Sequence, residues 1–124
     1  MADESFKAFV LDQLSGVPDV RVKSMFGGHG VYAGERFFGI IDEGRLYFKV
    51  DETTRGDYES RGMGAFTYEM KGREMTMGYY EVPPDVLENA MELELWARKA
   101  IRVAEAKAKE KSGIKTGKRI RKRD

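Results

Sequence analysis

The spacing of hydrophobic positions changes along the chain and divides it into segments of different predicted structure. Near the N-terminus apolar residues recur at helical spacing, which predicts an amphipathic helix that ends near Gly16. From Val20 to Val50 the period falls to two, which is typical of strands. After Asn89 the helical spacing returns. The apolar positions of the two helical stripes are Phe6, Phe9, Val10, Leu14, Leu93, Trp96, Ala97, Ala100, Ile101 and Ala104.

Three strands are expected in the region of period two. The first covers residues 20–33 and is expected to bulge or bend sharply at its glycine cluster, residues 27–30. The second is the apolar run 37–41, which suits a buried central strand. A hairpin turn at residues 42–44 leads into the third strand, residues 45–50.

The third strand carries a clean alternation of apolar and polar side chains. Its apolar positions are Leu46, Phe48 and Val50. On the opposite face a cation, an aromatic ring and a second cation follow one another, at Arg45, Tyr47 and Lys49. Because successive side chains of a strand point to opposite faces, one face is expected in the core and the other in water.

The second half of the chain begins with a short helix and two more strands. Asp51 is a suitable N-cap for the short helix, and Tyr58 is its main apolar anchor. The strands are expected at residues 66–70 and 74–82, joined by a short hairpin. Prolines 83 and 84 then stop the last strand, since proline cannot continue a ladder.

A long helix completes the predicted fold. Asn89 caps its start, and its end is expected at Ser112–Gly113. The full order of elements is α-β-β-β-α-β-β-α. Adjacent strands joined by hairpins pair in antiparallel fashion, so we predict an α+β fold of two layers, with an antiparallel five-stranded sheet and helices on one face.

Charge divides the chain into a body and a tail. Residues 1–106 carry 13 Lys and Arg against 19 Asp and Glu, whereas residues 107–124 carry 9 against 2. Dense like charge with two glycines does not pack, so we expect a flexible tail, separate from a domain at residues 1–106. The tail would attract polyphosphate, or it serves only as a solubilising terminus. Its candidate nucleic-acid contacts are Lys115, Lys118, Arg119, Arg121, Lys122 and Arg123.

The residue types give little support to catalysis or to a bound cofactor. The chain has no cysteine and one histidine, His29, so thiolate chemistry and a zinc site of cysteine and histidine are excluded. A strand rather than a helix follows the glycine cluster, which argues against a phosphate-binding loop. No G-x-S-x-G element surrounds a serine. We therefore expect a non-enzymatic protein with no cofactor, no metal and no catalytic residue.

Five separated motifs run through the chain from about Val20 to Ala104. They are Met25-Phe26-Gly27-Gly28-His29-Gly30-Val31-Tyr32, Gly44-Arg45-Leu46-Tyr47-Phe48-Lys49-Val50-Asp51, Phe66-Thr67-Tyr68, Gly78-Tyr79-Tyr80-Glu81-Val82-Pro83 and Leu95-Trp96-Ala97-Arg98. In this order they resemble the TfoX N-terminal domain family. The resemblance implies the same order of elements with an antiparallel sheet, a fold similar in outline to that of small secretion chaperones, which dimerise.

The resemblance also implies a function. The family includes regulators of natural competence in bacteria, which act with a cyclic-AMP-responsive activator at promoters and carry a second, helical domain after this one. In this chain the basic residues 107–124 follow instead. A regulatory interaction domain is therefore expected, with a second copy of the chain and a protein of the transcription machinery as its partners.

The location follows from the absence of targeting signals. The N-terminus shows no secretory signal. No run approaches the roughly 18 apolar residues of a membrane span. We expect a cytoplasmic protein that does not bind membranes.

The polar face of the third strand leaves three interpretations open. Basic and aromatic side chains on an open sheet bind single-stranded nucleic acid in several modules, although the net negative body disfavours that use. Alternatively, Tyr47 packs between the stems of its two basic neighbours, or the face is a dimer interface. The candidate interaction face comprises Arg45, Tyr47, Lys49 and Tyr80. Direct binding of DNA or RNA, through the tail and this face, is the alternative function.

Overall fold

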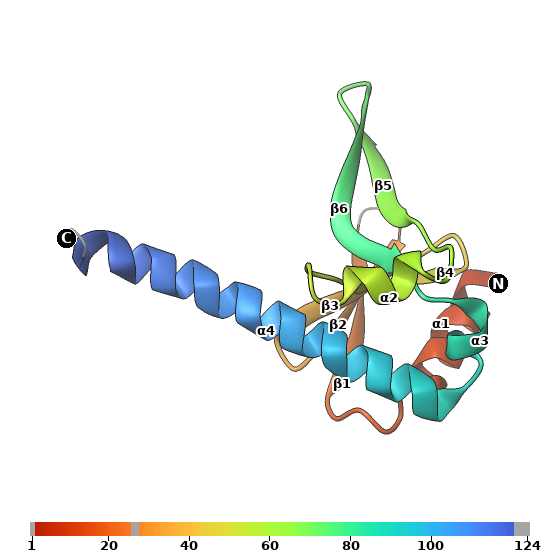
Figure 1. Cartoon of the computed structure of the whole chain (residues 1–124). Coiled ribbons are helices and arrows are strands. Elements are labelled where there is room, and N and C mark those ends of the chain that lie inside the picture. The colour runs from red at the N-terminus through yellow and green to blue at the C-terminus, as the bar shows by residue number, and fades with distance from the viewer. Residues whose placement is uncertain (1, 26–27, 121–124) are drawn as a thin grey trace.

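The structure is a computed structural model of the chain. It describes the backbone of residues 2–25 and 28–120, and the side chains of residues 4–25, 28–68, 71–73 and 78–109. In chain order the elements are α1 (Ala2–Gln13), β1 (Val20–Met25), β2 (Gly28–Ala33), β3 (Arg36–Asp42), β4 (Arg45–Lys49), α2 (Arg55–Glu59), β5 (Ala65–Met70), β6 (Arg73–Glu81), α3 (Pro84–Leu87) and α4 (Ala90–Ile120) (Figure 1).

The predicted α+β class is confirmed, but the sheet has six strands rather than five. Its order is β1-β2-β3-β4-β6-β5, and every pair of neighbours is antiparallel. The extra strand arises at the glycine cluster, which the sequence analysis placed within one strand. There the chain reverses, so that Met25 of β1 pairs with Gly28 of β2, and residues 26 and 27 lie outside the described part.

The backbone of β3 explains why glycine occupies position 28. A Cβ atom on Gly28 would lie 2.6 Å from the carbonyl oxygen of Ile41, closer than real Cβ atoms approach a backbone atom. Glycine is therefore the residue that lets β2 start so close to β3. The irregularity that was expected at the glycines occurs instead between Val31 and Tyr32, where the register of β2 and β3 shifts.

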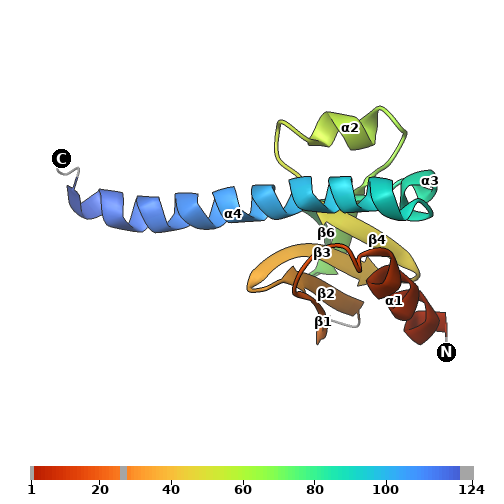
Figure 2. The same ribbon diagram turned by 90° about the horizontal axis from the view of Figure 1, so that it is seen from below.

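One face of the sheet carries the main core. Phe48 is fully buried and its ring centroid lies 5.5 Å from that of Phe38. The alternation predicted for β4 is confirmed, since Leu46, Phe48 and Val50 are all buried in this core. The helices cover this face, with α4 crossing the strands (Figure 2). The helices contribute Val10, Tyr58, Val86, Leu93, Ala97, Ala100 and Ala104 to this core, and Leu14 joins it just after the end of α1.

Two predicted helix caps have different outcomes. The Oδ1 atom of Asn89 accepts a hydrogen bond from the backbone N–H of Glu92 at 3.1 Å, so the cap of α4 is confirmed. Asp51, in contrast, is not the N-cap of α2, because Thr54 occupies that position. The carboxylate of Asp51 accepts hydrogen bonds from both the backbone N–H and the hydroxyl of Thr53, and it stabilises the turn that precedes the helix.

The last helix is longer than the sequence predicted. It continues through Ser112–Gly113, where its end was expected, as far as Ile120. Alanine, lysine, glutamate and arginine, which favour helices, outnumber the two glycines of this segment. Its C-terminal part extends beyond the rest of the molecule (Figures 1 and 2). The flexibility of the tail and its boundary at residues 106 and 107 stay predictions.

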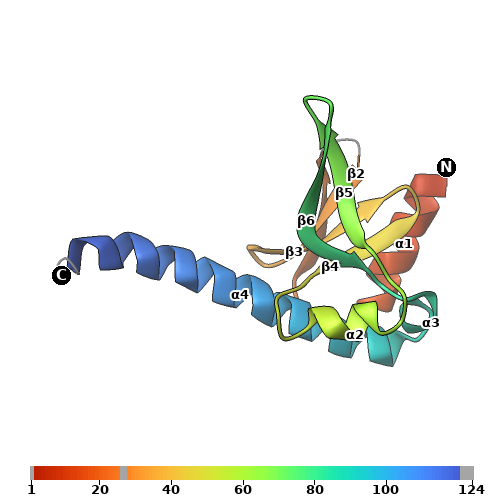
Figure 3. The same cartoon turned by 45° about the horizontal axis from the view of Figure 1, so that its top comes forward.

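A second projecting element is the hairpin of β5 and β6. Only residues 79–81 of β6 pair with β4, whereas the pairing of β6 with β5 continues to Arg73 and Met70. The outer part of the hairpin therefore stands away from the other strands (Figure 3). The sheet thus has two free edges, along β1 and β5.

Candidate interaction surfaces

The polar side chains predicted on β4 lie on the face of the sheet opposite the main core. Arg45 forms an ion pair with Glu81 at 3.7 Å. The half-buried ring of Tyr47 meets Phe66 edge-on, with 5.0 Å between ring centroids. Lys49 lies with its Nζ atom 4.7 Å from the centroid of the Tyr79 ring. All three side chains are therefore in contact with neighbouring strands.

Tyr80 does not lie on this face, which corrects the predicted grouping. It pairs with Phe48 in the sheet, and paired residues share a face. Its ring packs beside that of Tyr58 in the main core, and its hydroxyl donates a hydrogen bond to Glu59 at 3.0 Å. The structure thus separates Tyr80 from the other three residues of the predicted interaction face.

Six rings gather on the sheet face that the helices leave uncovered. We call this surface the aromatic face, and it comprises Tyr32, Phe37, Tyr47, Phe66, Tyr68 and Tyr79. Successive ring centroids lie 5.1 Å apart from Tyr32 to Phe37 and 5.5 Å apart from Phe37 to Tyr79. A second group places Tyr68 6.4 Å from Phe66, which in turn contacts Tyr47. Five strands therefore contribute rings to this face, in two groups of three.

Burial shows that this surface is a second, smaller apolar layer. Tyr79 is only 3% exposed, and Ile40 is also buried, yet neither belongs to the main core. The other five rings of the aromatic face are half-buried. Gly30 lies beneath them, because a Cβ atom there would come within 3.2 Å of Tyr32 and Phe37. The rings are thus held in place while part of their surface faces water.

The charges around these rings are mostly positive. Lys23 lies over the ring of Tyr32, with its Nζ atom 5.3 Å from the centroid. The strand register places further charged residues on this face, since paired residues share a face. They are the basic residues Arg21, Arg45 and Lys49 and the acidic residues Asp42 and Glu81. Among the residues that the structure describes, the aromatic face therefore carries four basic and two acidic side chains, although the body as a whole has more acidic than basic residues.

Burial also raises the pKa of four tyrosines, Tyr47, Tyr58, Tyr79 and Tyr80. It raises the pKa of the Tyr58 and Tyr79 hydroxyls well above the usual range. The pKa of Tyr47 is raised as well, first by burial and then by the negative charge of Glu81. Tyr58 belongs to the main core and Tyr79 to the aromatic face, so both layers hold a neutral phenol that resists ionisation.

These shifts predict a loss of stability in alkaline solution. In the unfolded chain Tyr58 and Tyr79 release their protons near pH 10, whereas the folded state keeps them protonated. Their contribution is therefore complete below pH 10 and is lost as the pH rises above it, at about 1.4 kcal/mol per pH unit for each tyrosine. Urea unfolding of the wild type and of Tyr79→Phe between pH 8 and about 11.5 measures this. The variant should show the smaller slope, and equal slopes would contradict the assignment.

The glycine cluster and His29 show no arrangement that binds a metal. His29 pairs with Ser24 of β1 and Ile41 of β3, and its side chain is half-buried. Within the part of the chain that the structure describes, no group of three histidine, aspartate or glutamate side chains is placed to hold a metal ion. The position of His29 is thus that of an ordinary residue in the middle of a sheet.

The tail residues follow the course of α4. Lys115, Lys118 and Arg119 lie within the helix, in the part that extends past the body (Figure 1). The predicted contacts Arg121, Lys122 and Arg123 lie outside the described residues. The described part of the basic tail therefore lies on α4, whereas the rings of the aromatic face lie on the sheet.

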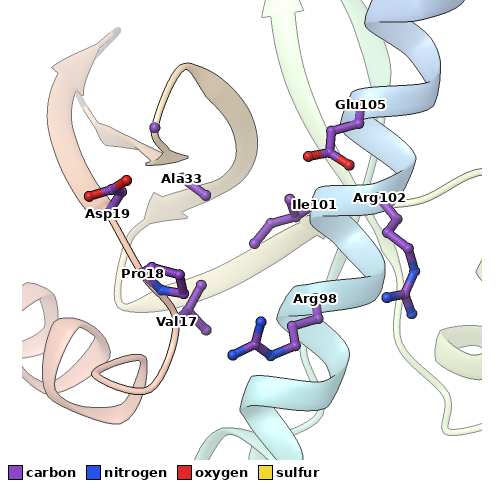
Figure 4. Close-up of a pocket in the computed structure, with 9 residues that line it drawn as sticks. Val17, Pro18, Asp19, Ala33, Arg98, Ile101, Arg102 and Glu105 are labelled. Carbon is purple, nitrogen blue, oxygen red and sulfur yellow. The ribbon is translucent and has the colours of Figure 1, made fainter.

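A surface pocket of about 300 Å³ lies between α4, the segment that precedes β1 and the turn that joins β2 to β3 (Figure 4). Its apolar lining includes Val17 and Ile101. The guanidinium of Arg98 donates to the carbonyl of Gly16 at 3.0 Å and to Glu94, so it serves the fold. The remaining charged groups of the lining are Asp19, Arg102 and Glu105, and their mixed signs favour neither an anion nor a cation.

Two exposed apolar residues on α4 were missed by the sequence analysis. Met91 is 80% exposed and Leu95 is 62% exposed. They are four residues apart, so they lie one turn above another on the side of the helix away from the buried stripe. Their spacing was visible in the sequence, and only their position opposite the stripe marks them as surface residues.

The fold and the comparisons with known proteins agree on the class of this chain. The structure is an α+β domain with an antiparallel sheet, helices on one of its faces and rings on the other. A family model described as the TfoX N-terminal domain matches residues 12–104. The chain belongs to the TfoX N-terminal domain family.

Two curated proteins are similar to the chain. Protein Sxy of Escherichia coli (strain K12) is 24% identical over 123 residues, which are 98% of this chain and 57% of Sxy. An uncharacterized 12.7 kDa protein in the trpE 5′ region of Spirochaeta aurantia is 34% identical over 62 residues, 50% of this chain and 54% of that protein. The chain therefore spans about half the length of the curated relatives it matches. Of the helices that the structure describes, none is long and apolar enough to span a bilayer.

Proposed function

We propose that this chain is a non-enzymatic regulatory interaction domain, which acts in the cytoplasm by contacting a protein of the transcription machinery. The observation that carries the proposal is the family match over residues 12–104, joined by the similarity to Sxy along almost the whole chain. A domain of this kind needs a surface for a partner rather than a catalytic site.

Exposed apolar residues support a protein partner. Water-exposed Met91 and Leu95 form a small apolar patch near the start of α4. Adjacent apolar side chains one turn apart are the pattern by which a helix contacts another protein. Methionine also adapts its shape to the partner at low cost.

Binding to purified transcription proteins tests this proposal. We expect the full chain to bind RNA polymerase or the cyclic-AMP-bound activator in biolayer interferometry. The double variant Met91→Gln, Leu95→Gln should bind at least about tenfold more weakly, which corresponds to about 1.4 kcal/mol. Ala90→Gln with Ala106→Gln is the matched control, because both alanines are exposed on the same helix. If the wild-type chain binds neither protein, the proposal is wrong.

We also propose that the chain forms a homodimer. The sheet ends in two edges, β1 and β5, whose outward backbone groups are available to pair with another strand. Sedimentation velocity over a range of concentrations should show a dimer. A monomer at every concentration would rule out dimerisation as part of the function.

A second candidate function, direct binding of nucleic acid through the tail, is favoured by the length of α4. The described part of the helix carries Lys115, Lys118 and Arg119 beyond the body, where a polyanion can approach without meeting the more acidic residues 1–106. If about five of these charges contact phosphates, the logarithm of the binding constant should fall with the logarithm of salt at a slope of roughly −4 to −5.

Fluorescence anisotropy with duplex DNA at low and physiological salt tests the tail. The full chain should bind with the slope given above, and a form that ends at Lys111 should lose most of its affinity. The full-length variant Lys115→Gln, Lys118→Gln, Arg119→Gln controls for the loss of length, and its slope should be shallower by about 2.7. Absence of binding by the full chain at low salt would refute this function.

A further inference from the structure

The aromatic face combines aromatic rings and positive charge, and none of the described helices covers it. These features point to a ligand. Its six rings come from β2, β3, β4, β5 and β6, on the side of the sheet that the helices leave open. Lys23 and Lys49 hold their ammonium groups over two of the rings. A ligand for this face therefore has flat apolar parts and negative charge in the same molecule.

We propose that the aromatic face binds single-stranded RNA. Bases stack on aromatic side chains while basic groups contact the phosphates, and a face that is basic on a net acidic body is complementary to such a strand. Part of each half-buried ring faces water, and contacts between the rings fix their orientation before a base arrives. This proposal does not rest on the protein partner or on the tail.

The charges on the face favour RNA over a second copy of the chain. In a two-fold symmetric dimer the same patch meets itself, so a face with four basic and two acidic residues would meet another face with the same excess of positive charge. Like charges brought together in an interface cost affinity. A polyphosphate neutralises the same groups and releases its counterions as it does so.

The acidic groups of the face favour RNA over DNA. Glu81 is opposite Tyr47 in the strand register and forms an ion pair with Arg45. Asp42 is opposite Arg45 in the register of β3 and β4. A carboxylate repels phosphate but accepts a hydrogen bond from a ribose 2′-hydroxyl, which DNA lacks. A strand whose sugars are donors therefore suits this mixture of groups better than a strand without them.

Fluorescence anisotropy of the full chain with labelled oligouridylate of about 16 nucleotides tests the proposal. The comparison strands are oligodeoxyuridylate of equal length and the duplex of oligouridylate with oligoadenylate. We expect the single-stranded RNA to bind most tightly. The variant Lys23→Gln, Lys49→Gln should reduce the salt slope by about 1.4, which is two phosphate contacts. Tyr68→Ala should weaken binding about tenfold through the loss of one stacked base.

Matched variants on the helical side separate this face from general charge effects. Lys7→Gln with Lys99→Gln removes the same charge from α1 and α4, and Phe9→Ala removes an exposed ring from α1. These controls should leave affinity and salt slope unchanged, and thermal unfolding by circular dichroism verifies that each variant is folded. Equal RNA binding by the wild type and the two variants of the aromatic face would overturn the proposal. Equal or tighter binding of oligodeoxyuridylate would overturn the choice of RNA. If the chain is a dimer that neither binds RNA nor dissociates when RNA is added, the face would be assigned to a second copy of the chain.

Discussion

Replacing Phe48 with alanine is expected to lower the free energy of unfolding by about 3–5 kcal/mol. Phe48 of β4 is completely buried, and its ring packs against Phe38 and the helical layer. Truncation removes the free energy that is gained by transferring the ring from water into the core. It also leaves a cavity, which the neighbouring strand and α4 are too rigid to fill. Because a domain of this size is stable by only about 5–15 kcal/mol, this single change removes a large part of its stability.

Equilibrium unfolding in urea, followed by the circular dichroism of the backbone, measures this loss. Phe9→Ala is the control, since Phe9 lies on α1 with 39% of its surface exposed, and it should cost about 1 kcal/mol or less. Similar losses for the two variants would show that Phe48 does not hold the position in the core that is described above.

Replacing Gly28 with alanine is expected to cost about 1–3 kcal/mol, although the change adds only one methyl group. The new Cβ atom would press on the backbone carbonyl of Ile41, which cannot move aside as the end of a flexible side chain would. β3 is held on both edges, by β2 and by β4. The first residues of β2 therefore have to move away from β3. The hydrogen bonds next to the turn between β1 and β2 are therefore expected to weaken.

Gly64→Ala is the matched control for Gly28→Ala. A Cβ atom on Gly64 meets nothing within 4 Å, so the change should alter the unfolding free energy by no more than about 0.5 kcal/mol. Amide hydrogen exchange in the Gly28→Ala protein should be faster in β1, β2 and β3 and unchanged in β5. Equal stability of the two alanine variants would contradict the close approach of β2 to β3.

The periodicity of the sequence predicted which side chains of a strand or helix are buried. It did not predict how the strands and helices pack against one another. The alternation in β4 placed Leu46 and Phe48 in the core correctly, because a period of two leaves only two faces to choose between. The number of strands was wrong at the glycine cluster, because a bulge and a tight turn both use glycine. The contact that distinguishes them, between Gly28 and Ile41, joins two different strands.

The candidate site shows the same division. Arg45, Tyr47 and Lys49 share one face, as the alternation along their strand predicts, whereas Tyr80 lies on the other; that the three contact a partner stays a prediction. The place of Tyr80 depends on whether Tyr79 or Tyr80 pairs with Phe48, and that register is a long-range property which no local pattern reveals. The rings that join Tyr47 on the aromatic face lie on other strands, so they became neighbours only once the strand order was known.

The continuity of α4 has a mechanical consequence. Its first half is fixed to the sheet by Leu93, Ala97 and Ala100, and the same helix runs on to Ile120 without a joint. A helix rises 1.5 Å per residue, so Ile120 stands about 20 Å beyond Ala106. As long as the helix stays continuous, a partner bound near Ile120 is held in a fixed direction relative to the open face of the sheet.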